Sequence, residues 1–201
     1  MSALFLYGTQ QLTFILPGGK NMNFADIKPI DVANGPGVRV SLFVSGCSHH
    51  CWNCFNKEAW DFNYGKVFTE NTLKELLEYL KPDYIKGLSL LGGEPLELQN
   101  QQGLLPLVKK VKELYPQKTI WCYTGFTFDE DILGYMWEKS FVTKELFAYL
   151  DVLVDGKYVE QLHSLNLNFR GSSNQRIIKV QESLKQGKVV LHELNTLGID
   201  S

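Results

Sequence analysis

The stretch "VRVSLFVSGCSHHCWNCFN" (residues 38–56) joins an alternating apolar segment to a loop that holds three of the four cysteines. Its first seven residues alternate valine or leucine with other side chains, which predicts a strand with one apolar face. Cys47, Cys51 and Cys54 follow directly, separated by three and then by two residues. A chain of 201 residues buries enough surface to fold without a metal or disulfide staple. The cysteine cluster is therefore expected to serve function.

Three kinds of site compete for these thiols. A disulfide is disfavoured for two reasons. The cluster contains three thiols, and the chain is expected in a compartment that keeps thiols reduced. A zinc site could take His49 or His50 as a fourth ligand, although zinc ligands usually come as two separated pairs. A cubane iron–sulfur cluster normally takes four cysteines. Three cysteines would leave one iron without a protein ligand and open for chemistry.

Composition argues against several classes of partner. The formal net charge of −2 gives no general attraction to nucleic acid or to an anionic membrane. No apolar run reaches the ~18 residues of a membrane-spanning helix. The first residues lack the basic start of a signal peptide. We therefore expect a cytoplasmic protein.

Apolar spacing along the rest of the chain predicts alternating helices and strands. Helices are expected at residues 69–80, 103–115, 129–139 and 143–150. Strands are expected at residues 87–91, 118–123, 150–156 and 176–180. Thr69 is expected to cap the first helix, and Pro106 to lie near the first turn of the second.

This alternation predicts an α/β fold with a mainly parallel sheet. Four polar or glycine-rich stretches, "SGCSHHCWNC", "LGGEP", "YTGF" and "VDGKY", each follow a predicted strand. In such sheets ligands bind beyond the carboxyl ends of the strands. The four stretches should converge on one rim. A complete eight-fold barrel needs ~250 residues, so the curved sheet with outer helices is expected to be an incomplete (β/α) barrel or an open sheet.

The cysteine spacing resembles that of the radical S-adenosylmethionine (SAM) superfamily. Residues 34–60, "NGPGVRVSLFVSGCSHHCWNCFNKEAW", resemble activases of glycyl radical enzymes, and "LLGGEP" (90–95) resembles the SAM-binding stretch of the superfamily. "WCYTGF" (121–126) and residues 152–178 resemble activating enzymes of anaerobic ribonucleotide reductase in particular. The resemblance runs from Asn23 to His192. Residues 1–22 are expected to be an N-terminal extension, and residues 23–201 the radical SAM activase domain.

The resemblance implies that Cys47, Cys51 and Cys54 ligate three irons of a [4Fe–4S] cluster and that SAM chelates the fourth. Reductive cleavage of SAM would give a 5′-deoxyadenosyl radical, which would take hydrogen from a glycine of the large reductase subunit. The reaction implies a strongly reducing donor such as flavodoxin. The alternatives are an activase of another glycyl radical enzyme, such as pyruvate formate-lyase, and a non-catalytic zinc-binding interaction module.

Cofactor-binding residues follow from the same resemblance. Gly93 and Glu94 are expected at the methionine end of SAM, where Glu94 would accept from its ammonium group. Asn53, Cys54 and Phe55 are expected near the adenosyl group. Asn53 stands where the superfamily often has an aromatic residue. No catalytic side chain is expected beyond the cluster and SAM site.

Several polar residues keep two interpretations each. His49 and His50 could hydrogen-bond a cluster sulfide or simply face solvent. Arg170, in a loop rich in glycine, serine and asparagine, could clamp a carboxylate of SAM or contact the partner's glycine loop. Gly125 and Asp155 could complete the pocket or form plain turns.

Two residues have mainly structural interpretations. Cys122 is expected to be a small buried apolar side chain rather than a fourth ligand. Arg39 alternates away from the valine face of its strand and could be structural.

Overall fold

Strand β2 (Val38–Val44) forms where the alternating stretch predicts it, with Val40, Leu42 and Val44 completely buried on one face. The structure, a computed structural model, describes residues 22–195. In that range seven strands form one sheet in the order β3-β1-β2-β4-β5-β6-β7. The other strands are β1 (Asn23–Asp31), β3 (Lys66–Val67), β4 (Ile85–Gly92), β5 (Thr119–Tyr123), β6 (Val152–Asp155) and β7 (Arg176–Lys179).

The α/β prediction is confirmed, but the sheet is mixed and open. Strands β2, β4, β5 and β6 are parallel, whereas β1, β3 and β7 pair antiparallel with their neighbours. Parallel neighbours need a long crossover connection. Only residues 32–37 separate β1 from β2, and a segment with no α-helix separates β6 from β7, so both of these pairs run antiparallel. The sheet is therefore mainly parallel only at its centre.

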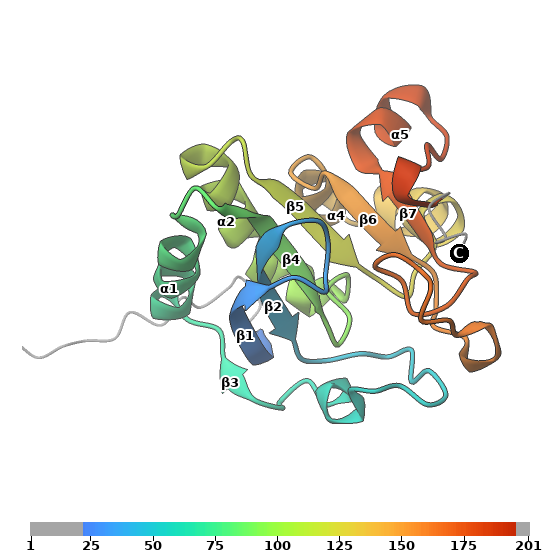
Figure 1. Ribbon diagram of the computed structural model, residues 1–201, viewed down its shortest axis with the longest axis horizontal. Coiled ribbons are helices and arrows are strands. Elements are labelled where there is room, and N and C mark those ends of the chain that lie inside the picture. Colours follow the sequence, from blue (N-terminus) through green and yellow to red (C-terminus); the bar gives the residue numbers. More distant parts are fainter. Residues whose placement is uncertain (1–21, 196–201) are drawn as a thin grey trace, which may run out of the picture.

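Helices cover the apolar face of the sheet. They are α1 (Glu70–Leu80), α2 (Leu98–Leu114), α3 (Trp137–Lys139), α4 (Phe141–Phe147) and α5 (Val180–Gln186), with a π-helix η2 (Phe128–Met136) before α3. Leucines of α1 and α2 belong to the same core cluster as Val40 and Leu42 of β2. Figure 1 shows the strands side by side and the segments that follow β2 and β6 at one edge of the molecule. Short 3₁₀ turns η1 (Lys57–Trp60), η3 (Glu160–Leu162) and η4 (Glu193–Asn195) complete the elements.

The helix predictions are confirmed with two corrections. Thr69 caps α1 as predicted, because its hydroxyl accepts from the backbone N–H of Thr72 at 3.2 Å. Helix α2 begins at Leu98, five residues before the predicted start, so Pro106 lies inside it rather than near its first turn. Polar residues such as Asn100, which is buried, conceal that first turn from a search for apolar spacing. The expected helix 129–139 is mostly the π-helix η2.

Arg39 is structural, as its position in β2 suggests. Its side chain is 1% exposed on the face opposite the valines. Its guanidinium donates to Ser89 Oγ at 2.8 Å, to Thr119 Oγ1 at 3.0 Å and to the carbonyls of Leu88 and Thr119 at 2.9 Å. These bonds satisfy most of its donors. Arg39 therefore joins β2, β4 and β5 on the face of the sheet opposite the helices.

The expected extension at residues 1–22 lies outside the described residues except for Met22. Met22 is 1% exposed and packs beside Gly103 of α2, where a Cβ would come within 2.7 Å of the Met22 Cβ. Met22 therefore belongs to the core. None of the helices in residues 22–195 has the length and apolar content that a membrane crossing requires.

Candidate active site

The cysteine loop leaves β2 at Ser45 and is fixed at both ends by the backbone. The N–H of Gly46 donates to the carbonyl of Ala59 at 2.8 Å, and the N–H of Cys47 donates to that of Trp60 at 3.2 Å. Between these bonds the chain takes left-handed backbone conformations at His50 (φ 47°) and Asn53 (φ 56°). Asparagine and histidine are enriched among non-glycine residues in this region. An aromatic residue in place of Asn53 would be less suited to this backbone.

All four cysteines lie in the described range and none forms a disulfide. Burial raises the pKa of the Cys47 thiol to about 11, with backbone N–H groups of His49 and His50 opposing the shift and the charge of Glu94 adding to it. Burial also raises the pKa of Cys51, opposed by a backbone hydrogen bond from Tyr158. Free thiols at these positions are therefore protonated near neutral pH. Binding a metal requires the thiolate and releases these protons.

Cys122 is separate from this group. It lies in β5, is completely buried, and belongs to the core cluster on the helix-covered face. Burial raises the pKa of its thiol well above the usual range. The prediction that it is a small apolar core residue agrees with this placement.

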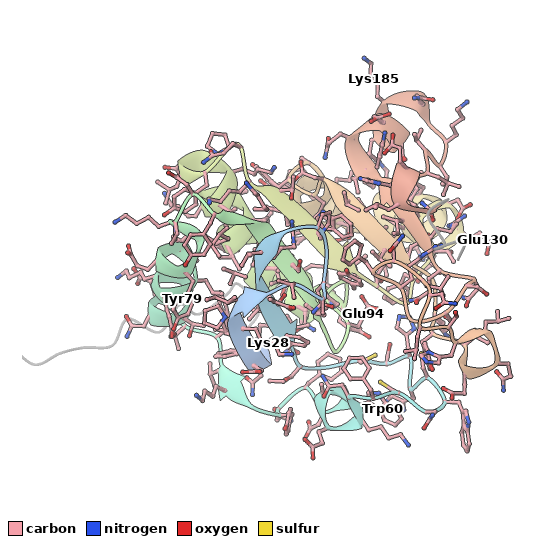
Figure 2. The ribbon with its side chains drawn as sticks, viewed as in Figure 1. Lys28, Trp60, Tyr79, Glu94, Glu130 and Lys185 are labelled. Atoms are coloured by element: carbon pink, nitrogen blue, oxygen red, sulfur yellow. The ribbon has the colours of Figure 1, made fainter. Side chains whose placement is uncertain are left out.

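The four predicted strand ends meet around a cavity of about 680 Å³. Each of the four polar stretches contributes to its wall: Cys47, Gly93, Gly125 and Gly156. The wall also includes every residue that the sequence assigns to the cluster or to SAM: Cys47, Cys51, Asn53, Cys54, Phe55, Gly93 and Glu94. Figure 2 labels Glu94 and Trp60 in the same region of the molecule as side chains with yellow sulfur atoms. The prediction of one converging rim is confirmed.

Gly93 allows the cysteine loop to approach β4 closely. A Cβ at this position would lie 2.6 Å from the carbonyl oxygen of Gly46 and 2.8 Å from that of Ala59. The N–H of Gly93 donates to the carbonyl of Val44 at 2.7 Å, and that of Glu94 to the carbonyl of Gly46 at 2.8 Å. Only glycine leaves room for this backbone-to-backbone contact.

Glu94 is 1% exposed and its carboxylate contacts four groups. Oε1 accepts from the N–H of Leu96 and from Thr124 Oγ1, both at 2.8 Å. Oε2 accepts from the N–H of Gly125 at 2.8 Å and lies 2.9 Å from His49 Nε2. A carboxylate has about four acceptor positions, so these four contacts fill them. Glu94 thus joins the cysteine loop to the ends of β4 and β5, a role that the sequence alone did not indicate.

The segment after β6 closes the other side of the cavity. Arg170 lines the wall, and its Nη1 donates to the carbonyl of Gln175 at 3.0 Å and to Asn195 Oδ1 at 3.3 Å. The expected contact with SAM or a partner stays a prediction, since these bonds hold Arg170 within its own chain. Asp155 pairs with Arg176, whose Nη2 lies 2.5 Å from its Oδ2, and is not part of the wall.

Three residues of the cavity wall each carry one buried polar atom that has no hydrogen-bond partner among the described residues: Trp60 Nε1, Tyr123 Oη and Arg170 Nε. Each carries a hydrogen-bond donor. Leaving such donors unpaired costs free energy. Each atom is closed off from the cavity and would have to turn toward it to meet an acceptor atom of a ligand. Trp60 and Tyr123 lie in stretches that carry the family resemblance, residues 34–60 and 121–126, but the sequence analysis assigned neither of them a role.

The donor set suits a cluster better than a single ion. Within residues 22–195, no three or more His, Cys, Asp or Glu side chains are grouped closely enough to hold one metal ion. In a cubane each thiolate binds a different iron, so the ligands need not converge on one point. Three free thiols on one cavity wall, with backbone N–H groups directed at two of the sulfurs, fit such a group.

Comparison with known proteins gives one consistent result. Residues 33–178 match the family described as "4Fe-4S single cluster domain". An anaerobic ribonucleoside-triphosphate reductase-activating protein of Enterobacteria phage T4 is 46% identical over 156 residues, which cover 78% of this chain and 93% of the relative. The protein of the same name from Escherichia coli K12 is 41% identical over 156 residues, covering 77% and 96% of the two chains.

Proposed function

Because this chain belongs to the family of anaerobic ribonucleoside-triphosphate reductase-activating proteins, we propose that it is a radical SAM enzyme that installs a glycyl radical on the large catalytic subunit of that reductase. The observation that carries the proposal is the shared cavity wall. Three loop cysteines and the glycine-rich end of β4 border the same space. Its seven-stranded sheet would be the incomplete barrel of the superfamily, and residues 23–201 its activase domain.

Cys47, Cys51 and Cys54 would hold the [4Fe–4S] cluster. When bound and reduced, the cluster supplies the electron that cleaves SAM into methionine and a 5′-deoxyadenosyl radical, which takes hydrogen from the partner's glycine. The chain itself supplies positioning and electrostatics. Three cysteines would leave one iron for SAM, and Cys122 is enclosed in the core on the helix-covered face of the sheet.

Gly93 and Glu94 would border the methionine end of SAM. The Glu94 carboxylate already takes four donors, so it would attract the ammonium group chiefly as a fixed negative charge. Asn53, Cys54 and Phe55 would border the adenosyl group, and the donors of Trp60 and Tyr123 would bind acceptor atoms of the ligand. Phe55, which is 87% exposed although it lines the cavity, would lose its contact with water when a ligand binds.

The test is an anaerobic reconstitution with iron and sulfide, followed by SAM and a low-potential reductant of the flavodoxin type. We expect a broad sulfide-to-iron absorption, formation of methionine and 5′-deoxyadenosine, and a glycyl radical signal in electron paramagnetic resonance when the reductase subunit is added. Pyruvate formate-lyase is the control partner and should give no radical. A colourless protein that binds one zinc ion and no sulfide would refute the proposal.

A further inference from the structure

His49 lies in the middle of the cysteine loop, but its side chain is buried, unlike those of its neighbours in the loop. Its side chain is 6% exposed, and its Nε2 lies 2.9 Å from Oε2 of Glu94, which is 1% exposed. A carboxylate only accepts hydrogen bonds, so the Nε2–H donates to Glu94. The neighbouring His50 is different, because it is exposed and stacks on Trp60 with ring centroids 4.5 Å apart.

The His49 ring also fills a space that the "TGF" turn after β5 leaves open. A Cβ at Gly125 would lie 2.5 Å from His49 Cδ2 and 2.7 Å from Nε2. The ring meets Phe126 edge to face, with centroids 4.3 Å apart. The N–H of Gly125 donates to the same Glu94 oxygen that His49 contacts. His49, Glu94, Gly125 and Phe126 thus form one partly buried group around the Glu94 carboxylate, which we call the histidine clamp.

We propose that His49 is a positioning residue that locks the cysteine loop onto the ends of β4 and β5, and that Gly125 is glycine because this ring occupies the place of a side chain. The proposal rests on the proposed function, in which the loop holds the cluster. His49 lies two residues after Cys47 and two before Cys51. Fixing its ring therefore limits how far either thiol can move relative to the cavity.

Both parts of the side chain are needed for this role. The Nε2–H satisfies one acceptor position of a buried carboxylate, which is costly to leave unpaired. The flat ring packs between Gly125 and Phe126, where a flexible side chain would have to lose rotamer freedom. Residues that contact metal ligands and fix their orientation commonly lower the affinity for the metal when they are removed.

The first test compares three variants for cluster retention. His49→Ala removes donor and ring, His49→Gln keeps an N–H donor without the ring, and His49→Phe keeps a ring without the donor. We expect a chelator to remove iron about tenfold faster from His49→Ala than from the wild type, with the other two variants between them. The reduced cluster of each should also show an altered paramagnetic resonance spectrum. His192→Asn is the matched control, because this histidine lies outside the cavity wall, and it should retain iron like the wild type.

The second test needs no cluster. In the metal-free protein, Gly125→Ala should lower the Tm by roughly 3–10 °C, because the added methyl group overlaps the ring. Combined with His49→Ala, the same change should lower the Tm by less than half as much. If His49→Ala does not fold, His49→Gln takes its place in the cycle. Equal shifts in both backgrounds would show that the ring does not exclude a side chain at Gly125 and would overturn the proposal.

The two tests separate the inference from the proposed function. A wild type that takes up no iron and sulfide refutes the function, whereas the thermal cycle still reports on the clamp. A wild type that loads normally, with His49 variants that retain iron and give spectra as it does, refutes the positioning role and leaves the function intact.

Discussion

At the scale of single residues, the cavity distinguishes cysteines of the same chain by their surroundings. Cys47 and Cys51 border open space, whereas Cys122 is enclosed by apolar side chains. The cysteine spacing singled out Cys47, Cys51 and Cys54 as a group, and the family resemblance predicted that they bind a cluster. No spacing rule could place Cys122, whose burial depends on how β5 packs against the helices.

Substituting Cys51 and Cys122 separately should therefore have different effects. Cys51→Ala removes one of three proposed cluster ligands, so the reconstituted protein should show weak or labile sulfide-to-iron absorption. Cys122→Ala should load normally but lose about 1 kcal/mol of unfolding free energy, because it shortens a buried side chain. Visible spectra and urea unfolding of both variants check this. A cluster that depended on Cys122 would contradict the assignment.

Tyr123 offers a residue-scale test of ligand binding. Tyr123 lines the cavity, and its buried hydroxyl has no partner among the described residues, so Tyr123→Phe should leave stability almost unchanged. Its affinity for SAM should fall roughly fivefold, equivalent to one hydrogen bond of about 1 kcal/mol. Tyr115→Phe is the control, since that hydroxyl donates to the Leu77 carbonyl at 3.1 Å outside the cavity. It should lose stability and keep its affinity, as measured by urea unfolding and calorimetric titration.

At the scale of elements, the sequence predicted the strands that are regular and apolar and missed those that are not. Strand β1 contains Pro29 and shows register shifts between Lys28 and Asp31, and only Phe24 and Asp31 of its nine residues are buried. Such a bulged strand near the edge of the sheet has neither clear alternation nor an apolar run. The antiparallel direction of β7 depends on the path of the preceding segment, which has no local sequence signal.

Arg176 links two elements, and this link predicts a pH dependence. Its guanidinium bonds both oxygens of Asp129 at 3.1 and 2.8 Å, joining the start of η2 to β7. These bonds hold the pKa of Asp129 below its ordinary value of 3.8. A lowered carboxyl pKa stabilises the fold above the unfolded value, and this contribution is lost as pH falls through the folded value.

Asp129→Asn should therefore destabilise the protein at neutral pH and have little effect in acid. Because Asp129 is half exposed, we expect a loss of no more than about 1 kcal/mol at pH 7, which decreases as the pH falls below 3.8. Urea unfolding at pH 7 and at a series of pH values below 3.8 measures it, with the neighbouring Glu130→Gln as control. A difference that stayed constant across that series would rule out ionisation of Asp129 as the cause.

At the scale of the whole molecule, the site exists because separate strand ends meet. The sequence predicted this convergence, since parallel strands present their carboxyl ends at one edge. It could not predict the contacts made there, such as Glu94 with Thr124 and Gly125, because they join residues about 30 positions apart. The predicted order of helices and strands was enough to predict the convergence of the strand ends. The hydrogen-bond partners became apparent only in the three-dimensional structure.

Gly93 is the residue of the site at which we expect a substitution to be tolerated least. Gly93→Ala would press a methyl group against two carbonyl oxygens, so we expect a loss of about 1–3 kcal/mol together with poor cluster retention. Gly134→Ala is the control, because the nearest atom to its added Cβ is at 3.4 Å and lies outside the cavity. Thermal unfolding and iron content distinguish the two variants. Normal iron content in a folded Gly93→Ala protein would show that the close approach is not required.

The segment that closes the cavity also fixes an order of events during synthesis. The wall residues from Gly156 to Gln175 leave the ribosome roughly 120 residues after the cysteine loop, which at 5–20 residues per second is on the order of 10 s. During that interval the nascent chain carries its thiols without the wall that shelters them. A cluster built in that interval would lack the wall that the later segment completes, which Arg170 ties to the side chain and carbonyl of Asn195.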